Sequence, residues 1–140
     1  MNLALEATIQ NELENLLASR IIFPIKYFEW VENLVSVRKM NGDIRLCIEF
    51  CALNKASVKD NFHFPNMELI LQPVVGSQMI SLLEGFSGYN NIKVKNSDRY
   101  KTTFTTRWGT FTYERMPFVL INAGTTFQHA MHIAFASLPQ

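Results

Sequence analysis

Long apolar runs, a leader-like amino terminus and a strong charge of one sign are all absent from these 140 residues. No apolar stretch approaches the roughly 20 residues that cross a bilayer, and residues 1–10 show no basic region followed by an apolar one. We therefore expect an intracellular protein with no membrane partner. Thirteen basic residues against twelve acidic ones leave a net charge of +1, so nucleic-acid binding must depend on a local basic patch.

Cysteine is scarce, with only Cys47 and Cys51 in the chain. On an extended strand residues four apart share a face without lying close enough to bond, so we expect reduced thiols. An alternative zinc site would combine these cysteines with His129 and His132, but the long gap between the two pairs matches no compact zinc finger.

What the chain does contain is a composition typical of a globular protein, 48% hydrophobic and 18% charged. It shows no internal repeat, low-complexity segment or linker. We therefore predict one compact α+β unit in which antiparallel hairpins are flanked by helices.

Helical spacing of apolar residues predicts a helix at each end of the chain. The first should end near Arg20, because Pro24 biases the residue before it toward extended structure. Thr125 or Thr126 can cap the last one. The apolar faces consist of Leu5, Ile9, Leu13, Leu16 and Leu17 in the first helix, and of Phe127, Ala130, Met131, Ala134, Phe135 and Leu138 in the last. Asn66 can cap a short third helix, which Pro73 ends.

Strand signals occur in three places. Asn41-Gly42 favours a hairpin between residues 34–38 and 44–50, because both tolerate positive φ. Alternation in the second strand puts Ile44, Leu46, Ile48 and Phe50 on a core face. Residues 79–83 are a short apolar run that predicts a buried strand delivering Glu84 to its end. Residues 100–106 and 111–114 predict a second hairpin around Trp108-Gly109.

A series of short phrases resembles the reverse transcriptases of gypsy-type long-terminal-repeat retrotransposons, from about Leu13 to about Phe135. The phrases are Arg20-Ile-Ile-Phe-Pro24, Trp30, Val37-Arg-Lys-Met-Asn-Gly-Asp-Ile-Arg-Leu-Cys47, Ala52-Leu-Asn-Lys55, Ser87-Gly-Tyr89, Ile92-Lys-Val94, Lys101-Thr-Thr-Phe104, Met116-Pro-Phe118, Asn122-Ala123 and Thr126-Phe-Gln128. The resemblance implies part of a right-hand polymerase. Residues 1–25 would be a helix and connector, 26–75 the fingers, and 76–140 part of the palm.

The same resemblance implies a nucleotide site. Lys39 and Arg45 would hold the triphosphate of an incoming deoxynucleoside triphosphate, the guanidinium as a rigid donor fork and the ammonium as a point charge. Tyr89 would exclude a 2′-hydroxyl, Phe118 would line the nucleotide pocket, and Gln128 would face an RNA or DNA template-primer. Each residue also has a simpler interpretation. Lys39 and Arg45 could be solvated charges on an exposed hairpin, and Tyr89 could be an ordinary half-buried tyrosine. Gln128 could be a polar residue on the solvent side of a helix.

Catalysis in the family requires two Mg²⁺ ions held by three aspartates. Glu84 occupies the position of the first aspartate, and no Tyr-x-Asp-Asp phrase occurs before Gln140, so the implied metal site is incomplete. A glutamate sets its carboxylate one methylene further out, and a displacement of about 1 Å costs roughly a hundredfold in rate. Further departures from the family pattern are Cys51, Pro73, Gly85, Phe86, Val119 and Gly124.

These observations predict a truncated, catalytically inactive reverse transcriptase domain of a retrotransposon polyprotein, an RNA-directed DNA polymerase by family. The missing palm, thumb and RNase H parts would lie on another chain. Two alternatives remain: a fragment that binds nucleic acid without chemistry, and a decayed element copy with no selected activity. Trp30 and the neighbouring Tyr27 and Phe28 are expected to be buried, since the family implies that this tryptophan packs beneath the fingers.

Overall fold

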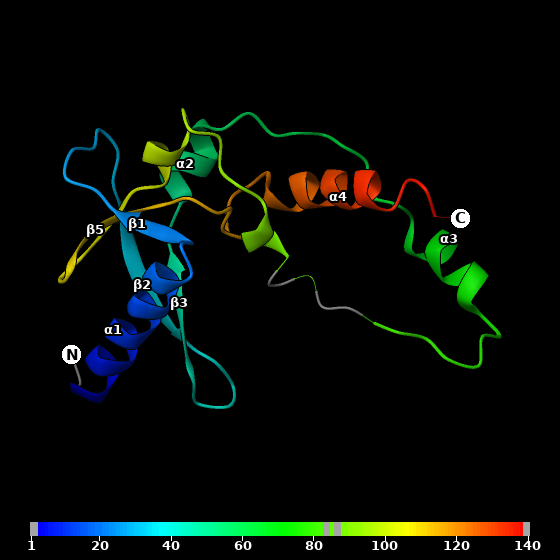
Figure 1. Cartoon of the computed structure of the whole chain (residues 1–140), viewed down its shortest axis with the longest axis horizontal. Coiled ribbons are helices and arrows are strands. Elements are labelled where there is room, and N and C mark those ends of the chain that lie inside the picture. Colours follow the sequence, from blue (N-terminus) through cyan, green and yellow to red (C-terminus); the bar gives the residue numbers. More distant parts are fainter. Residues whose placement is uncertain (1–2, 83–84, 86–87, 139–140) are drawn as a thin grey trace.

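A computed structural model of the chain describes residues 3–82, 85 and 88–138 (Figure 1). The α-helices are α1 (Leu3–Ala18), α2 (Cys51–Ala56), α3 (Met67–Leu71) and α4 (Ala123–Ala134). The strands are β1 (Ile22–Pro24), β2 (Glu32–Arg38), β3 (Ile44–Ile48), β4 (Phe104–Thr106) and β5 (Gly109–Tyr113), and the short 3-10 helices are η1 (Gln72–Val74), η2 (Tyr89–Asn91) and η3 (Arg99–Thr102).

The strands of the described residues form one mixed sheet in the order β1-β5-β4-β2-β3. Three neighbouring pairs are antiparallel, whereas β2 runs parallel to β4 with Glu32 opposite Phe104. The helix α1 packs on this sheet, whereas α4 extends away from it (Figure 1). The predicted α+β class is confirmed.

The β2–β3 hairpin forms where the sequence predicts it. Val37 pairs with Arg45, and the turn places Gly42 at a φ of 90°, a conformation that side chains with a Cβ rarely adopt. Asn41 accepts a hydrogen bond from the backbone N–H of Asp43 at 3.1 Å. The strand ends at Ile48, two residues before the predicted end, because α2 begins at Cys51. Cys51 is therefore a helical residue, and the predicted strand pattern does not indicate this helix.

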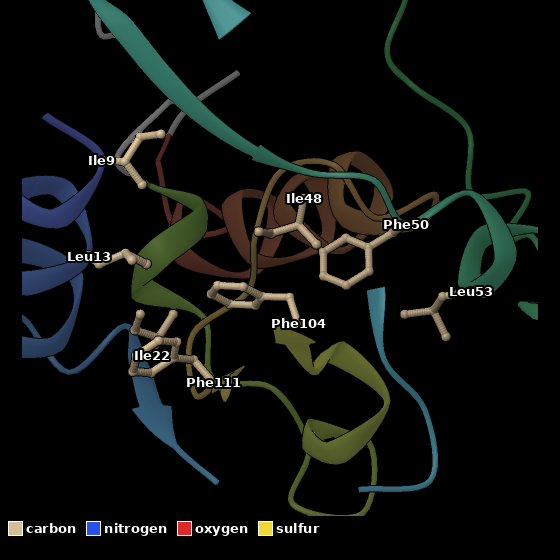
Figure 2. Close-up of a cluster of buried hydrophobic side chains, with 8 residues drawn as sticks. All are labelled: Ile9, Leu13, Ile22, Ile48, Phe50, Leu53, Phe104 and Phe111. Atoms are coloured by element: carbon tan, nitrogen blue, oxygen red, sulfur yellow. The ribbon is translucent and has the colours of Figure 1, made fainter. Parts of the chain in front are cut away.

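The core lies between α1 and the sheet. Phe104 is fully buried, and Figure 2 shows its ring between Ile48 and Phe111. Burying side chains of this size contributes about 1.5–3 kcal/mol each. Eight buried residues make up this core: Ile9, Leu13, Ile22, Ile48, Phe50, Leu53, Phe104 and Phe111. The predicted first helix, with Ile9 and Leu13 on its buried face, is confirmed.

The second hairpin is shorter than predicted. Its first strand begins at Phe104, and Arg99–Thr102 form the helix η3 instead. The hydroxyl of Thr102 donates to the carbonyl of Arg99 at 2.6 Å, and that of Thr103 donates to the carbonyl of Tyr100 at 2.7 Å. Such bonds to a carbonyl three residues earlier favour a helical turn over an extended strand.

The predicted buried strand at residues 79–83 is wrong in its described part. Residues 79–82 are not a strand, and Met79 and Leu82 are 91% and 92% exposed. An apolar run becomes a buried strand only when a neighbouring strand pairs with it, and no described strand does so here. Residue 83 and Glu84 lie outside the described residues.

The last helix begins earlier than predicted. Asn122 is its N-cap residue, so Thr125 and Thr126 lie within the first turn rather than capping it. The hydroxyl of Thr125 donates to the carbonyl of Asn122 at 3.0 Å. The helix ends at Ala134, and the apolar residues Phe135 and Leu138 beyond it are exposed.

The chain is more open than the predicted compact unit. Its accessible surface is 10581 Å², whereas a folded monomer of 16.1 kDa exposes about 7,400 Å². Figure 1 shows the reason, since the segment that carries α3 runs far from the sheet.

The predicted burial of the aromatic residues around Trp30 is wrong, because Tyr27, Phe28 and Trp30 are all exposed. None of the described helices has the length and apolar character needed to cross a membrane.

Candidate nucleotide-binding site

Arg45 and Phe118 meet across the fold. Arg45 lies on the exposed face of β3, and its guanidinium carbon is 5.7 Å from the centroid of the Phe118 ring. Phe118 belongs to the loop between β5 and α4. An arginine over an aromatic face at this distance is held by a cation–π attraction of about 0.5–1 kcal/mol at an exposed site. Two residues that the sequence assigned to one site are therefore brought together.

Two asparagine side chains fix the loop that carries Phe118. The Asn54 amide donates to the carbonyl of Val119 at 3.1 Å and accepts from the backbone N–H of Ile121 at 2.8 Å. Asn122 donates to the carbonyl of Val58 at 2.8 Å and accepts from the N–H of Asp60 at 2.9 Å. Both asparagines occur in the phrases that carry the resemblance, but no pattern in the sequence predicts a role for them.

Tyr89 packs on α4. Its ring stacks on that of Phe127, with centroids 4.8 Å apart and an interplanar angle of 28°. Gly88 permits this approach, because a Cβ at that position would come within 2.6 Å of the Phe127 ring. The tyrosine is therefore half-buried and held against a helix, which fits both the predicted size filter and the alternative of an ordinary half-buried tyrosine.

Gln128 follows Phe127 in α4 and is half-buried. It lines a shallow cavity of about 420 Å³ together with Ile70, Met131 and Phe135. Gln128 thus lies next to Phe127, the ring on which Tyr89 stacks, and shares this cavity with Ile70 of α3.

Lys39 lies at the turn of the β2–β3 hairpin and is exposed. Its backbone N–H donates to the carbonyl of Asp43 at 2.7 Å, and its carbonyl accepts from the N–H of Gly42 at 3.0 Å. The turn holds the backbone of Lys39 firmly. The ammonium group is at the end of a long flexible side chain on the same hairpin as Arg45.

Metal ligands do not gather in the part of the chain that the structure describes. No three side chains of histidine, cysteine, aspartate or glutamate there are placed to hold one ion. Glu84, the one predicted catalytic and metal-binding residue, lies outside this part. Cys47 and Cys51 are free thiols, and a hydrogen bond to the Glu49 carboxylate raises the pKa of Cys51. The described residues therefore fit neither a two-magnesium centre nor the alternative zinc set.

Comparison with known proteins finds similarity to retroelement proteins. No family model matches the chain. It is 32% identical over 128 residues to the retrovirus-related Pol polyprotein from transposon gypsy of Drosophila melanogaster, which covers 88% of this chain and 12% of that protein. It is 33% identical over 89 residues to an RNA-directed DNA polymerase homolog of Oenothera berteroana, covering 64% of this chain and 63% of that protein.

Among solved structures, the foamy viral protease-reverse transcriptase in complex with an RNA/DNA hybrid matches with a TM-score of 0.75. The identity is 16%, and the match covers 99% of this chain and 19% of that one. The chain thus spans only part of the relatives it matches. It has the fold of part of a reverse transcriptase polymerase domain. Its relatives in sequence include a retrotransposon Pol polyprotein and an RNA-directed DNA polymerase homolog, which supports a reverse transcriptase segment.

Proposed function

We propose that these residues form the nucleotide-binding part of a gypsy-type retrotransposon reverse transcriptase. In this proposal residues 1–25 are a helix and connector, 26–75 belong to the fingers, and 76–140 belong to the palm. The substrate class is a deoxynucleoside triphosphate, and the macromolecular partner is an RNA or DNA template-primer. The sequence similarity to the Pol polyprotein from transposon gypsy, and a shared fold over almost the whole length of the chain, support this assignment.

The observation that carries the proposal is the contact between Arg45 and Phe118. It joins the predicted fingers hairpin to the predicted pocket loop, and Asn54 holds that loop through two hydrogen bonds. The planar guanidinium can bind two phosphate oxygens while its face rests on the ring. Lys39, at the turn of the same hairpin, adds a second positive charge that can swing toward the phosphates.

Tyr89 is proposed to select the sugar. Stacked on Phe127, its ring has little freedom to move away from an added 2′-hydroxyl. Gln128, one residue further along the same helix, is proposed to contact the template-primer. Both roles depend on the arrangement of η2 against α4.

We further propose that the 140 residues alone do not polymerise DNA. In the family two Mg²⁺ ions activate the primer hydroxyl and neutralise the triphosphate. The sequence contains Glu84 at the position of the first aspartate and no adjacent pair of aspartates. We therefore assign binding to these residues and no metal-assisted step.

Calorimetric titration of the chain with a deoxynucleoside triphosphate tests this function. Hydrogen bonds to charged groups contribute about 1.5–3 kcal/mol, so Arg45→Ala should weaken binding roughly 10- to 100-fold. Lys55→Ala is the matched control, because Lys55 is an exposed cation on α2 outside the site. Equal losses in both variants would refute the site.

The decayed-copy alternative makes a different prediction for the same samples. It expects no nucleotide binding in any variant and no cooperative thermal unfolding by circular dichroism. Binding that is lost only in the Arg45→Ala variant contradicts that alternative.

A primer-extension assay with magnesium tests the proposed absence of catalysis. It should show no incorporation of nucleotides by the 140-residue chain, and incorporation would contradict the proposal.

A further inference from the structure

The helix α2 links the two parts of the proposed nucleotide site. It follows β3, the strand that carries Arg45, and in Figure 1 it lies at the end of the β2–β3 hairpin opposite the turn. Its N-cap residue Phe50 has no side-chain acceptor for the helix. Instead, the first-turn N–H of Leu53 donates to the carboxylate of Glu32 in β2 at 3.3 Å. Because β2 pairs with β3, this bond fixes α2 to the hairpin that carries Arg45.

Asn54 connects this helix to the loop that carries Phe118. Its side chain is half-buried, and its amide both donates to the carbonyl of Val119 and accepts from the N–H of Ile121. These two backbone groups lie one and three positions after Phe118, so the bonds hold the chain directly beyond the ring. An amide can donate and accept at once, which neither an apolar side chain nor an ionised carboxylate can do. The two bonds therefore depend on the amide of Asn54.

The loop is also held on the other side of Phe118. The backbone N–H of Met116 donates to the carbonyl of Ile92 at 2.8 Å, and Met116 and Pro117 are both buried. Phe118, between these anchored positions, is 40% exposed. The bond of Met116 joins two backbone groups and can form with other side chains at that position. Of these hydrogen bonds, only those of Asn54 depend on the identity of a side chain.

We propose that Asn54 is a positioning residue for the nucleotide site, which holds the ring of Phe118 against the guanidinium of Arg45 and does not itself touch the nucleotide. Through α2 it sets the distance between β3 and the loop. Its effect on nucleotide binding rests on the proposed function, but the contact that it maintains is present without a nucleotide. A residue that only stabilised the fold would leave the affinity of the folded molecules unchanged. A positioning residue changes that affinity, because the apparent Kd rises as the population of the competent conformation falls.

Nuclear magnetic resonance of the 140-residue chain tests the positioning without a nucleotide. The ring of Phe118 should displace the resonances of the Arg45 side-chain protons, and Phe118→Leu identifies that displacement. Asn54→Ala should remove most of it. Thr102→Val is the matched control, because it also leaves a backbone N–H without its acceptor, that of Tyr113, but outside the site. No displacement in the unmodified chain, or an unchanged one in Asn54→Ala, would overturn the proposal.

Calorimetric titration with a deoxynucleoside triphosphate tests the consequence for binding. Asn54→Ala should bind roughly fivefold or more weakly, whereas Thr102→Val should bind as the unmodified chain does. The double variant Asn54→Ala/Phe118→Ala should bind as Phe118→Ala does, since without the ring Asn54 has nothing to position. Losses that multiply in the double variant would show that Asn54 acts by another route and would overturn the proposal.

The two proposals fail in different ways. If the unmodified chain binds no nucleotide, the nucleotide site is refuted, and the resonance measurement still decides whether Asn54 positions the ring. If Arg45→Ala weakens binding and Asn54→Ala does not, only the positioning role is refuted. Circular dichroism checks that each variant is folded. If Asn54→Ala is not folded, Asn54→Asp replaces it in the resonance measurement, where a carboxylate cannot donate to the Val119 carbonyl and should again remove the displacement.

Discussion

Gly88 is the residue whose replacement most directly tests the packing of Tyr89. A Cβ there would lie 2.6 Å from Phe127 Cε2 and 2.9 Å from its Cζ, so Gly88→Ala must push the ring out of its stack. Overpacking of this kind costs about 1–3 kcal/mol. We expect the variant to lose that much free energy of unfolding in urea melts.

Gly124→Ala is the matched control for this prediction. A Cβ at Gly124 would meet Phe64 Cζ at 3.5 Å, an ordinary contact, and Gly124 lies in α4, where alanine is the better helix former by up to about 1 kcal/mol. This variant should be as stable as the unmodified chain or more so. Equal destabilisation in the two variants would mean that the Tyr89–Phe127 stack does not depend on Gly88.

The sequence phrases did not predict which side chains contact one another. Arg45 and Phe118 were assigned to one site and do meet, but nothing in the sequence distinguishes a guanidinium over a ring from one in solvent. In the sequence, Asn54 and Asn122 stand out only as members of the phrases that carry the family resemblance. Their hydrogen bonds span more than sixty positions of chain, with Asn54 reaching Ile121 and Asn122 reaching Asp60 and Val58, and no local pattern encodes such pairs.

At the scale of elements, local signals succeeded and long-range requirements failed. The β2–β3 hairpin depends on a turn that Asn41-Gly42 specifies by itself, so its position was predictable. Residues 79–82 carry an equally apolar pattern, but a strand also needs a neighbour, and that requirement is invisible in the run itself. The helix η3 replaced predicted strand because threonine hydroxyls bond to nearby carbonyls.

The connection between η3 and β5 gives a prediction at this scale. The buried Thr102 hydroxyl donates to the carbonyl of Arg99 and accepts from the backbone N–H of Tyr113 at 3.1 Å. Thr102→Val keeps the shape but leaves that N–H without its partner, which costs about 1–3 kcal/mol. Urea melts should show this loss. Thr105→Val, on the exposed face of β4, should change the free energy of unfolding by less than about 0.5 kcal/mol, and a larger change there would contradict the argument.

At the scale of the whole molecule, the buried residues divide the chain unevenly. The core joins α1, the sheet and the start of α2, whereas none of residues 57–82 is buried. Large apolar side chains on that segment, including Phe64, Ile70 and Leu71, are exposed. Composition predicted a buried core correctly, but it contains no information about which apolar residues occupy that core and which remain on the surface.

Limited proteolysis measures this uneven distribution directly. A segment with few buried contacts opens at little cost in free energy, whereas cleavage within the core requires its unfolding. Chymotrypsin at low dose should therefore cut between residues 62 and 82, where Phe64 and Leu69 are exposed, before it cuts at Phe104 and Phe111. Mass spectrometry of the fragments over time gives the order. Simultaneous cleavage at both places would mean that the sheet and α1 are no more stable than the segment around α3, and the core described above would then not protect the chain.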